Sequence, residues 1–471
     1  MTKALLETLI LMVLFSATLP AESEGTPKSP NLIVIMVDDM GYADVGFNGC
    51  EDIPTPHIDS IAAGGVKFTS GYVAYAVCGP SRASFITGRY GQRFGFERNP
   101  QYQPSDPNMG VPIEETTIAD ALQEVGYHSG VIGKWHLGAH EVLHPLSRGF
   151  DEFYGHLGGG HRYLPEELTI QDSYEAKGES ESYQTWILRN REPVQPTKYL
   201  TDEFSDEAVS FIDRNHAKPF FLYLAYNAPH LPLQATEKYL ARFPDLEGKR
   251  KIYAAMVSAV DDGVGRVLES LRKNQIEDDT LVFFLSDNGG PETKNASDNG
   301  PLRGDKGSVY EGGHRVPFAA KWPARFPKGV VYDQPVISLD IFGTIAALSG
   351  APTDPERPLD GVNLTPYVTG ERSGRPHEAT YMRKFDSGSF IVRSGDHKLV
   401  IPGRDEKAQL YNVTTDIGET TNLAYKDSDI RDQLKNKLDA WTDELIEPRF
   451  LGLIHTEAFQ KKNQKANGKQ K

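Results

Sequence analysis

Two pairs of oxygen-bearing side chains directly follow the two most apolar stretches of the sequence. Asp38 and Asp39 come after NLIVIMV, and Asp287 and Asn288 come after TLVFFLS. Carboxylate and amide oxygens suit hard divalent cations, which would need two or more further oxygens here. A single pair fits a helix cap or a turn at least as well. Because two pairs occupy equivalent places, the sequence favours a cation site, and no His/Cys set has zinc spacing.

A nucleophile and several basic side chains form a second group. In AVCGPSRASFITGRYG (76–91), Pro80 fits the first turn of a helix, which places Cys78 at the positive helix end. Arg82 returns to the same side one turn later. Singly, basic residues are more often solvated or structural. Together with a cation they predict a site for a small oxyanion ester, to which other segments contribute Lys134, His136, His230 and Lys306.

The segments that carry these residues alternate between apolar strands and amphipathic helices. Strands are expected in NLIVIMV, YHSGVIGKWHLG, KPFFLYLAYNAPH and DTLVFFLS, and Lys134 and His136 share one face if their strand continues. Helices are expected at about 117–125, 202–214 and 250–273. This alternation predicts an α/β fold with a large, mostly parallel sheet sandwiched by helices. Ligands of such sheets gather at the carboxyl ends of the strands.

The pattern changes near residue 370, where short strands separated by turns replace the long alternation. EATYMRKF, SGSFIVRSG, DHKLVI and AQLYNV precede a helix expected near 428–446, which predicts a smaller C-terminal antiparallel sheet with one covering helix. We therefore assign a catalytic domain to 29–368 and an α+β subdomain to 369–450. The lysine-rich segment 459–471 is expected to be a disordered basic tail.

Charge and the N-terminal segment restrict the partners and the location. Lys+Arg 50 and Asp+Glu 65 give a net charge of −15 over 471 residues, which repels nucleic acid and anionic membranes. An anionic substrate therefore needs a local positive cluster. Residues 1–23 predict a signal peptide and a secreted or periplasmic protein. The alternative is a membrane anchor, but Glu7 and Pro20 leave the run short, and no other stretch predicts a membrane span.

Ordered motifs connect the sequence with a known family. Cys78-Gly79-Pro80-Ser81-Arg82 matches the Cys-x-Pro-Ser-Arg signature of the sulfatases, which belong to the alkaline-phosphatase-like superfamily. NLIVIMVDDMGYADVG, TPHID, GKWHLG, APH, FLSDNGG, LRGDKGSVYEGGHRVP and QLYNVTTDIGETTNLA resemble sulfatase blocks in the same order. The resemblance extends from about residue 30 to 450. It implies a sulfuric ester hydrolase with an alkaline-phosphatase-like fold.

The resemblance gives the cysteine a specific role. From the residues alone, Cys50 and Cys78 could form a disulfide or lie apart as small buried side chains. In the family, a separate maturation enzyme oxidises the signature cysteine to Cα-formylglycine (3-oxoalanine). One hydroxyl of its hydrate attacks sulfur, and the other allows the sulfate to leave. A disulfide would block maturation of Cys78, so Cys50 is expected to be a free, buried thiol.

The remaining roles follow from the same resemblance. Arg82 would steady the hydrated aldehyde, and Lys134 would bridge it to the sulfate. His136 would act as the base for the second hydroxyl, and His230, helped by Lys306, would protonate the leaving oxygen. One Ca²⁺ ion would be bound by Asp38, Asp39, Asp287 and Asn288.

Substrate candidates come from outside these blocks. The glycine-rich segment 152–167 carries His156, His161 and Arg162, and is either a flexible loop or part of a glycan site. We name His161, Arg162, His314 and Arg98 as candidate substrate-binding residues. The blocks most resemble carbohydrate sulfatases, which implies a sulfated polysaccharide or oligosaccharide substrate, with a marine galactan such as carrageenan as our expectation. The alternatives are a glycosaminoglycan or aryl sulfatase, a phosphonate or phosphate-ester hydrolase, and a non-catalytic glycan-binding relative.

Overall fold

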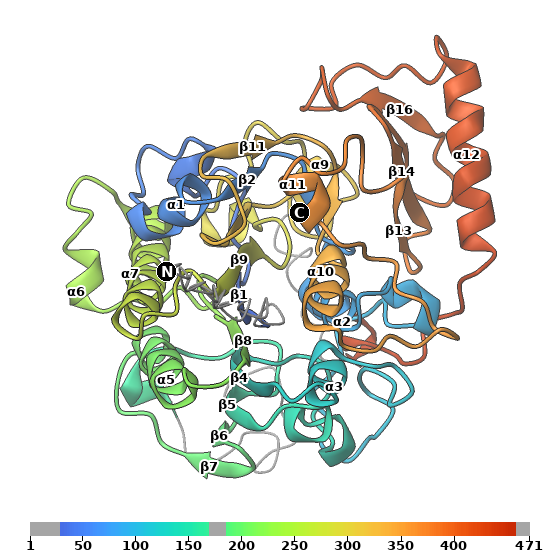
Figure 1. The fold of residues 1–471 in the computed structure, drawn as a ribbon. Coiled ribbons are helices and arrows are strands. Elements are labelled where there is room, and N and C mark those ends of the chain that lie inside the picture. The colour runs from blue at the N-terminus through green and yellow to red at the C-terminus, as the bar shows by residue number, and fades with distance from the viewer. Residues whose placement is uncertain (1–28, 169–184, 458–471) are drawn as a thin grey trace, which may run out of the picture.

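The computed structural model describes residues 29–168 and 185–457 of the chain (Figure 1). The predicted signal peptide, 1–23, and the predicted tail, 459–471, lie outside the described residues. Within the described part, no helix combines the length and apolar character that crossing a membrane requires.

A ten-stranded sheet runs through the centre of the molecule in the order β11-β2-β10-β9-β1-β8-β4-β5-β6-β7. The pairs β9-β1, β1-β8, β8-β4, β4-β5 and β2-β11 are parallel, so the prediction of a large, mostly parallel sheet is confirmed. The strands are β1 (Asn31–Val37), β2 (Val66–Phe68), β4 (His128–Lys134), β5 (Glu152–His156), β6 (Ile187–Arg189), β7 (Glu192–Val194), β8 (Phe220–Ala225), β9 (Thr280–Ser286), β10 (Phe318–Lys321) and β11 (Val330–Tyr332).

Helices cover both faces of this sheet (Figure 1). One face packs against α1 (Pro56–Ala63), α5 (Leu200–Asn215) and α7 (Gly248–Lys273), and the other against α2 (Cys78–Thr87), α3 (Ile118–Gln123) and α10 (Asp340–Ser349). Alternate residues of β1 therefore belong to different cores: Leu32, Val34 and Met36 lie in one, and Ile33, Ile35 and Val37 in the other. Burial on both faces explains why this strand is apolar throughout.

The helices predicted from apolar spacing form where they were expected. The expected helix 117–125 is α3, whose N-cap Thr117 and Asp120 form a reciprocal capping box. The segments expected at 202–214 and 250–273 are α5 and α7. Short helices occur at α6 (Glu237–Leu240), α8 (Glu292–Asn295), α9 (Glu311–His314) and α11 (Thr365–Val368).

The predicted C-terminal antiparallel sheet is also present. It has the order β13-β14-β15-β16, with β13 (Thr380–Lys384), β14 (Ser389–Ser394), β15 (His397–Ile401) and β16 (Gln409–Asn412). The covering helix α12 (Ser428–Thr442) ends four residues before the predicted 446. A two-stranded sheet of β3 (Gly71–Tyr72) and β12 (Val336–Ile337) belongs to the larger part of the chain.

The small sheet packs directly against the segment that leads to Cys78. Ile391, Val400 and Tyr411 share a core cluster with Tyr75 and Ala76. Its other face packs against α12 through Val392, Leu399 and Leu434. The C-terminal strands therefore support the start of α2. The domain boundary at 368/369 falls between α11 and β13 and stays a prediction.

Candidate active site

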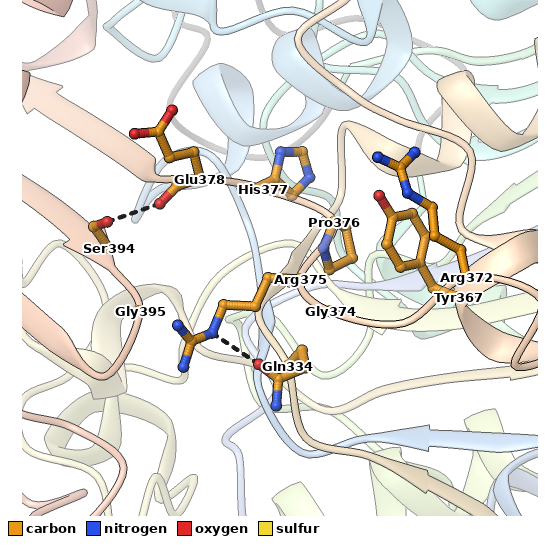
Figure 2. Close-up of a pocket in the computed structure, with 10 residues that line it drawn as sticks. All are labelled: Gln334, Tyr367, Arg372, Gly374, Arg375, Pro376, His377, Glu378, Ser394 and Gly395. Carbon is orange, nitrogen blue, oxygen red and sulfur yellow. Dashed lines mark hydrogen bonds between the residues drawn. The ribbon is translucent and has the colours of Figure 1, made fainter.

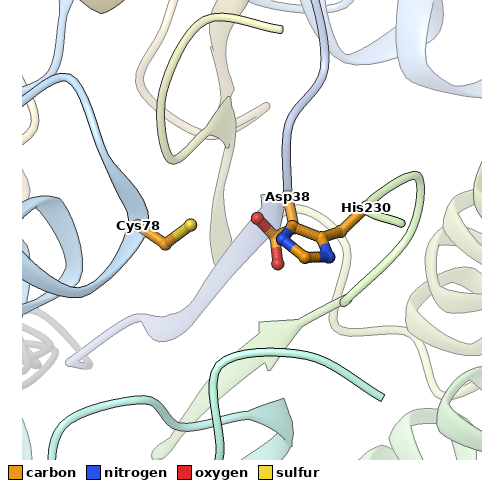
Figure 3. Close-up of side chains that lie close together, drawn as sticks. All are labelled: Asp38, Cys78 and His230. Carbon is orange, nitrogen blue, oxygen red and sulfur yellow. The ribbon is translucent and has the colours of Figure 1, made fainter. Parts of the chain in front are cut away.

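The candidate residues converge at one edge of the central sheet. β9, β1, β8 and β4 are adjacent and parallel, so their carboxyl ends meet there. Asp38 follows β1, Asp287 follows β9, Lys134 ends β4, and His230 lies five residues after β8. Figure 3 shows Cys78 pointing toward Asp38 from the α2 side, with the His230 ring beside Asp38. The convergence at strand ends is the arrangement expected for a ligand site in an open α/β sheet.

The acidic residues form a compact buried cluster. One ligand atom from each of Asp38, Asp39, Asp287 and Cys78 lies within 4.8 Å of all the others. The Asp39 backbone N–H donates to Asp287 Oδ1 over 3.3 Å, and Asn288 Nδ2 donates to Asp39 Oδ1 over 2.7 Å. Asp39 adopts a left-handed backbone with φ 66°, which lets consecutive aspartates both take part.

Two oxygens of this cluster have the environment of cation ligands. Asp38 Oδ1 and Asn288 Oδ1 are buried and accept no hydrogen bond from any described residue. Buried polar atoms without partners are rare and require an explanation. A hard divalent cation supplies one, since it binds such oxygens directly. The donor set therefore fits the predicted calcium ion.

Cys78 is a buried thiol at the N-terminus of α2. Its Sγ accepts a hydrogen bond from Lys306 Nζ over 3.0 Å. Burial raises the pKa of Cys78 to about 12, although Lys134 and Lys306 act in the opposite direction. Burial therefore disfavours the thiolate, which is the nucleophilic form of cysteine. This environment fits a cysteine that must be converted before it reacts.

Three cations balance the three carboxylates. Arg82 Nε and one terminal nitrogen lie 2.8 Å from Asp287 Oδ2. Lys134 Nζ lies 2.5 Å from Asp38 Oδ2, and Lys306 Nζ lies 2.5 Å from Asp39 Oδ1. With one positive group for each carboxylate the cluster is neutral overall. A divalent cation would make it positive, which supplies the local charge that an anionic substrate needs in a chain of net charge −15.

The carboxyl groups of the cluster differ in their pKa. Burial favours the neutral form of Asp39, but the nearby Lys306 and His230 outweigh it and lower its pKa to about 2. Burial and the Asp38 charge raise the pKa of Asp287 to about 6, despite Arg82. A bound cation favours the charged form of each carboxylate.

His136 reaches the site by a route that strand alternation did not predict. β4 ends at Lys134, and His136 has a left-handed backbone with φ 59°, so the strand does not continue and the condition for a shared strand face is not met. Its Nδ1 has no hydrogen-bond partner among the described residues, and the ring faces Gly159. Burial, together with Lys134 and Arg82, holds the pKa of His136 well below its usual 6.5. These effects favour the neutral form of the imidazole.

His230 is held by its own turn. Nδ1 lies 2.6 Å from the Leu231 carbonyl oxygen, which fixes Nδ1 as a donor, and Nε2 lies 3.6 Å from Asp39 Oδ2. Burial lowers the pKa of His230 to about 3, with Lys306 and Lys134 adding to the effect and Asp39 opposing it. Burial therefore favours the neutral form of the ring even beside Asp39.

The four candidate substrate-binding residues have partners elsewhere in the chain. Their ring or guanidinium nitrogens make these contacts: His161 with the carbonyls of Arg162 and Thr185, Arg162 with Glu167, His314 with Lys398, and Arg98 with Asp386 and the Phe450 carbonyl. Arg162 is the most exposed of them in the structure. A role in substrate binding stays a prediction for each.

Several supporting residues escaped the sequence reasoning. Tyr223 lies 3.1 Å from an Arg82 nitrogen, and Asn99 accepts from the Gly79 N–H over 2.9 Å. Lys384 of β13 donates to the Gly307 carbonyl, next to Lys306. None of these lies in a motif, because each acts through a long-range contact.

Cys50 is free, as predicted, but it is only half-buried. Its Sγ donates to Asp52 Oδ1 over 3.3 Å, and burial raises its pKa to about 11. The expectation of full burial was wrong because Cys50 lies in the surface turn that follows β1 and reaches solvent beside Asp52.

Comparisons with known proteins agree with this geometry. The Sulfatase family model matches residues 30–351, and the model for the C-terminal region of N-sulphoglucosamine sulphohydrolase matches residues 304–444. N-acetylgalactosamine-6-sulfatase of Canis lupus familiaris is 36% identical over 376 residues, which cover 77% of this chain and 70% of the relative.

Solved structures give the same result. The crystal structure of Ps i-CgsB, also solved in complex with k-i-k-neocarrahexaose, has a TM-score of 0.85 and 39% identity, covering 94% of this chain and 98% of its own. A phosphonate monoester hydrolase of Agrobacterium radiobacter, at 20% identity and TM-score 0.64 over 88% of this chain and 96% of its own, shares the fold alone.

Proposed function

This chain belongs to the sulfatase family of sulfuric ester hydrolases, and we propose that it removes sulfate from a sulfated galactan such as carrageenan. The similarity to Ps i-CgsB, whose structure holds a neocarrahexaose, carries the choice of substrate. The curated relatives named N-acetylgalactosamine-6-sulfatase support a second candidate, a sulfated glycosaminoglycan. Both candidates are sulfated carbohydrates.

We propose that one calcium ion is held by Asp38, Asp39, Asp287 and Asn288. The support is the pair of buried oxygens without partners, together with the compact arrangement of the three carboxylates. Such an ion withdraws negative charge from oxygens bound to it and so stabilises a transition state of developing charge. Arg82, bonded to Asp287 and to Tyr223, keeps the Asp287 carboxylate oriented.

We propose that Cys78 is converted to Cα-formylglycine by a separate maturation enzyme. The hydrated aldehyde would supply one hydroxyl as the nucleophile toward sulfur, and a second hydroxyl through which the sulfate would be released. Two ammonium groups of the chain lie near this position. Lys306 Nζ donates to Cys78 Sγ, and Lys134 Nζ donates to Asp38, which is part of the same cluster. These ammonium groups would attract and orient the negatively charged sulfate.

The two histidines would take part in different proton transfers: His136 would accept a proton, and His230 would donate one. Neutral His136, with a buried Nδ1 that lacks a partner, is suited to accept the proton of the second hydroxyl. The sulfate group brings negative charge close to His230 and raises its pKa toward that of a general acid. His230 can then donate through Nε2 to the leaving oxygen, while Lys306 stabilises the charge that develops there.

Export and domain roles complete the proposal. We assign residues 1–23 to a signal peptide, which places the enzyme in the periplasm or outside the cell. Residues 29–368 would be the catalytic domain, and residues 369–450 a subdomain that supports it. His161, Arg162, His314 and Arg98 remain candidates for contacts to the sugar.

The alternatives differ in chemistry at the same site. A phosphonate hydrolase would share the fold, but the phosphonate monoester hydrolase that this chain resembles is 20% identical, and this similarity supports the fold alone. A non-catalytic glycan-binding relative would be expected to lack part of the reactive set. Here the chain has the whole candidate set: Cys78, Lys134, Lys306, His230 and the three aspartates lie close together, Arg82 is bonded to Asp287, and Asn288 is bonded to Asp39.

The test is sulfate release from a panel of defined substrates. The panel contains carrageenan oligosaccharides, sulfated glycosaminoglycan oligosaccharides, an aryl sulfate and an aryl phosphonate. We expect release from the carrageenan oligosaccharides to be fastest, and Cys78→Ala to abolish release from every substrate while keeping the fold. Faster turnover of the glycosaminoglycan oligosaccharides would show that the substrate is a glycosaminoglycan and not a galactan. Faster turnover of the phosphonate would overturn the proposal.

A further inference from the structure

An open cavity lies between the catalytic core and the C-terminal sheet. It has a volume of about 820 Å³, and its lining comes from the loop after β11, from α11 and the segment that follows it, and from the β14–β15 turn. Figure 2 shows Tyr367 and Arg372 side by side in this cavity, and Arg375 reaching Gln334. None of the reactive residues described above lines it.

The chemistry of the lining is cationic and hydrogen-bonding. The Arg372 guanidinium lies over the Tyr367 ring, 5.1 Å from its centre. Among the described residues no carboxylate lies within ion-pair distance of Arg372, which is exposed to solvent. Arg375 instead has Asp396 Oδ1 at 2.8 Å and Gln334 Oε1 at 2.8 Å, which hold it extended.

His377 is a further basic side chain in the lining of the cavity. Its Nε2 lies 2.6 Å from Asp340 Oδ1. Burial lowers the pKa of His377, but the Asp340 carboxylate outweighs burial and raises the pKa above 6.5. Glu378 pairs with Lys437, Asp396 with Arg375 and Asp340 with His377, whereas Arg372 has no carboxylate partner among the described residues. An arginine side chain without a carboxylate partner can form charge-assisted hydrogen bonds with an anion such as sulfate.

The cavity also has a defined relation to the catalytic cluster. β11 runs parallel to β2, which runs in the same direction as β9 and β1, so Gln334 follows β11 at the edge where Asp38 and Asp287 lie. Three strand spacings separate β11 from β9, or roughly 14 Å. This strand separation is within the length of an oligosaccharide of several sugar units.

We propose that this cavity binds a second sulfated sugar of the carbohydrate whose sulfate is removed at Cys78. The inference rests on the proposed function. Arg372 pairs with the sulfate of that sugar, and Gln334 and Ser394 offer hydrogen-bonding groups to its hydroxyls. Binding there holds a long substrate without taking part in the reaction. The same anion chemistry could also serve free inorganic sulfate, which the experiment separates.

The test compares two arginines that both lie over an aromatic ring. Arg372→Ala removes the cation in the cavity, and Arg325→Ala is the matched control, because exposed Arg325 lies over Trp322 at 5.5 Å outside the cavity. With a carrageenan hexasaccharide, we expect Arg372→Ala to raise KM about tenfold and leave kcat unchanged. Turnover of an aryl sulfate should be unchanged in both variants.

Binding measurements in a Cys78→Ala background complete the design. The hexasaccharide should bind about tenfold more weakly when Arg372→Ala is added, whereas inorganic sulfate should not distinguish the two proteins. If Arg372→Ala behaves like Arg325→Ala toward the hexasaccharide while the wild type hydrolyses it, the cavity inference alone is wrong. If only inorganic sulfate binding is lost, the cavity is a free oxyanion site. If the wild type neither binds nor hydrolyses the hexasaccharide, both proposals fail.

Discussion

Gly159 offers a sharp test of the role of His136. A Cβ built at Gly159 would lie 2.7 Å from His136 Nε2, where ordinary contact begins at 3.4 Å. The ring tip must therefore retreat by about 0.7 Å in Gly159→Ala. Gly159 has no positive φ, so the backbone accepts alanine and the change acts through the ring. Misplacement of a catalytic group by about 1 Å can lower the rate about 100-fold.

We expect Gly159→Ala to lower kcat for an aryl sulfate about 10- to 100-fold. The loss of unfolding free energy should stay within the ~1–3 kcal/mol typical of local overpacking. Gly158→Ala is the matched control, since its Cβ would meet Thr185 Oγ1 at 3.6 Å, an ordinary contact. Kinetics and urea denaturation of both variants decide the matter. Equal activity in the two variants would refute the placement of His136 as the base.

Three further predictions follow from the same contacts. A chelator that removes calcium should lower the free energy of unfolding by about 2.7 kcal/mol, relative to protein in Ca²⁺ at a hundred times its Kd. Thermal denaturation measures this change, and Asn288→Ala should abolish it. In calcium-free protein, Lys306→Met leaves Asp39 buried without its nearest cation, and urea denaturation should show a loss of about 3–5 kcal/mol. The raised pKa of His377 means that its pairing with Asp340 stabilises the fold fully below pH 6.5 and progressively less as the pH rises through the folded-state pKa. The stability difference between wild type and His377→Gln should shrink accordingly on raising the pH from 6 to 9, and a difference that grows with pH would contradict this.

The sequence predicted those parts of the fold that depend on local pattern. The apolar runs of β1 and β9 identified a sheet buried on both faces, and the carboxyl-end rule then placed Asp38 and Asp287 at one edge. Pro80 correctly indicated a helix beginning near Cys78. These inferences succeed because burial and helix initiation leave a trace within a few neighbouring residues.

The parts that the sequence did not predict depend on long-range contacts or unusual backbone. Strand alternation fails at His136 because its backbone is left-handed directly after β4. Candidate status for His314 came from its charge, but the structure places it beside Lys398 and Tyr72, which belong to distant segments. The buried link between Glu311 on α9 and Lys398 on β15, 2.9 Å long, joins the Lys306 loop to the C-terminal sheet in a way no motif shows.

The state of residue 78 tests the central claim most directly. Trypsin releases residues 68–82 as one peptide, so its mass reports whether Cys78 has lost sulfur. The protein should be produced with and without a maturation enzyme, and specific activity should be proportional to the fraction of peptide that carries the aldehyde. Full sulfatase activity in protein whose peptide retains the thiol would contradict the account.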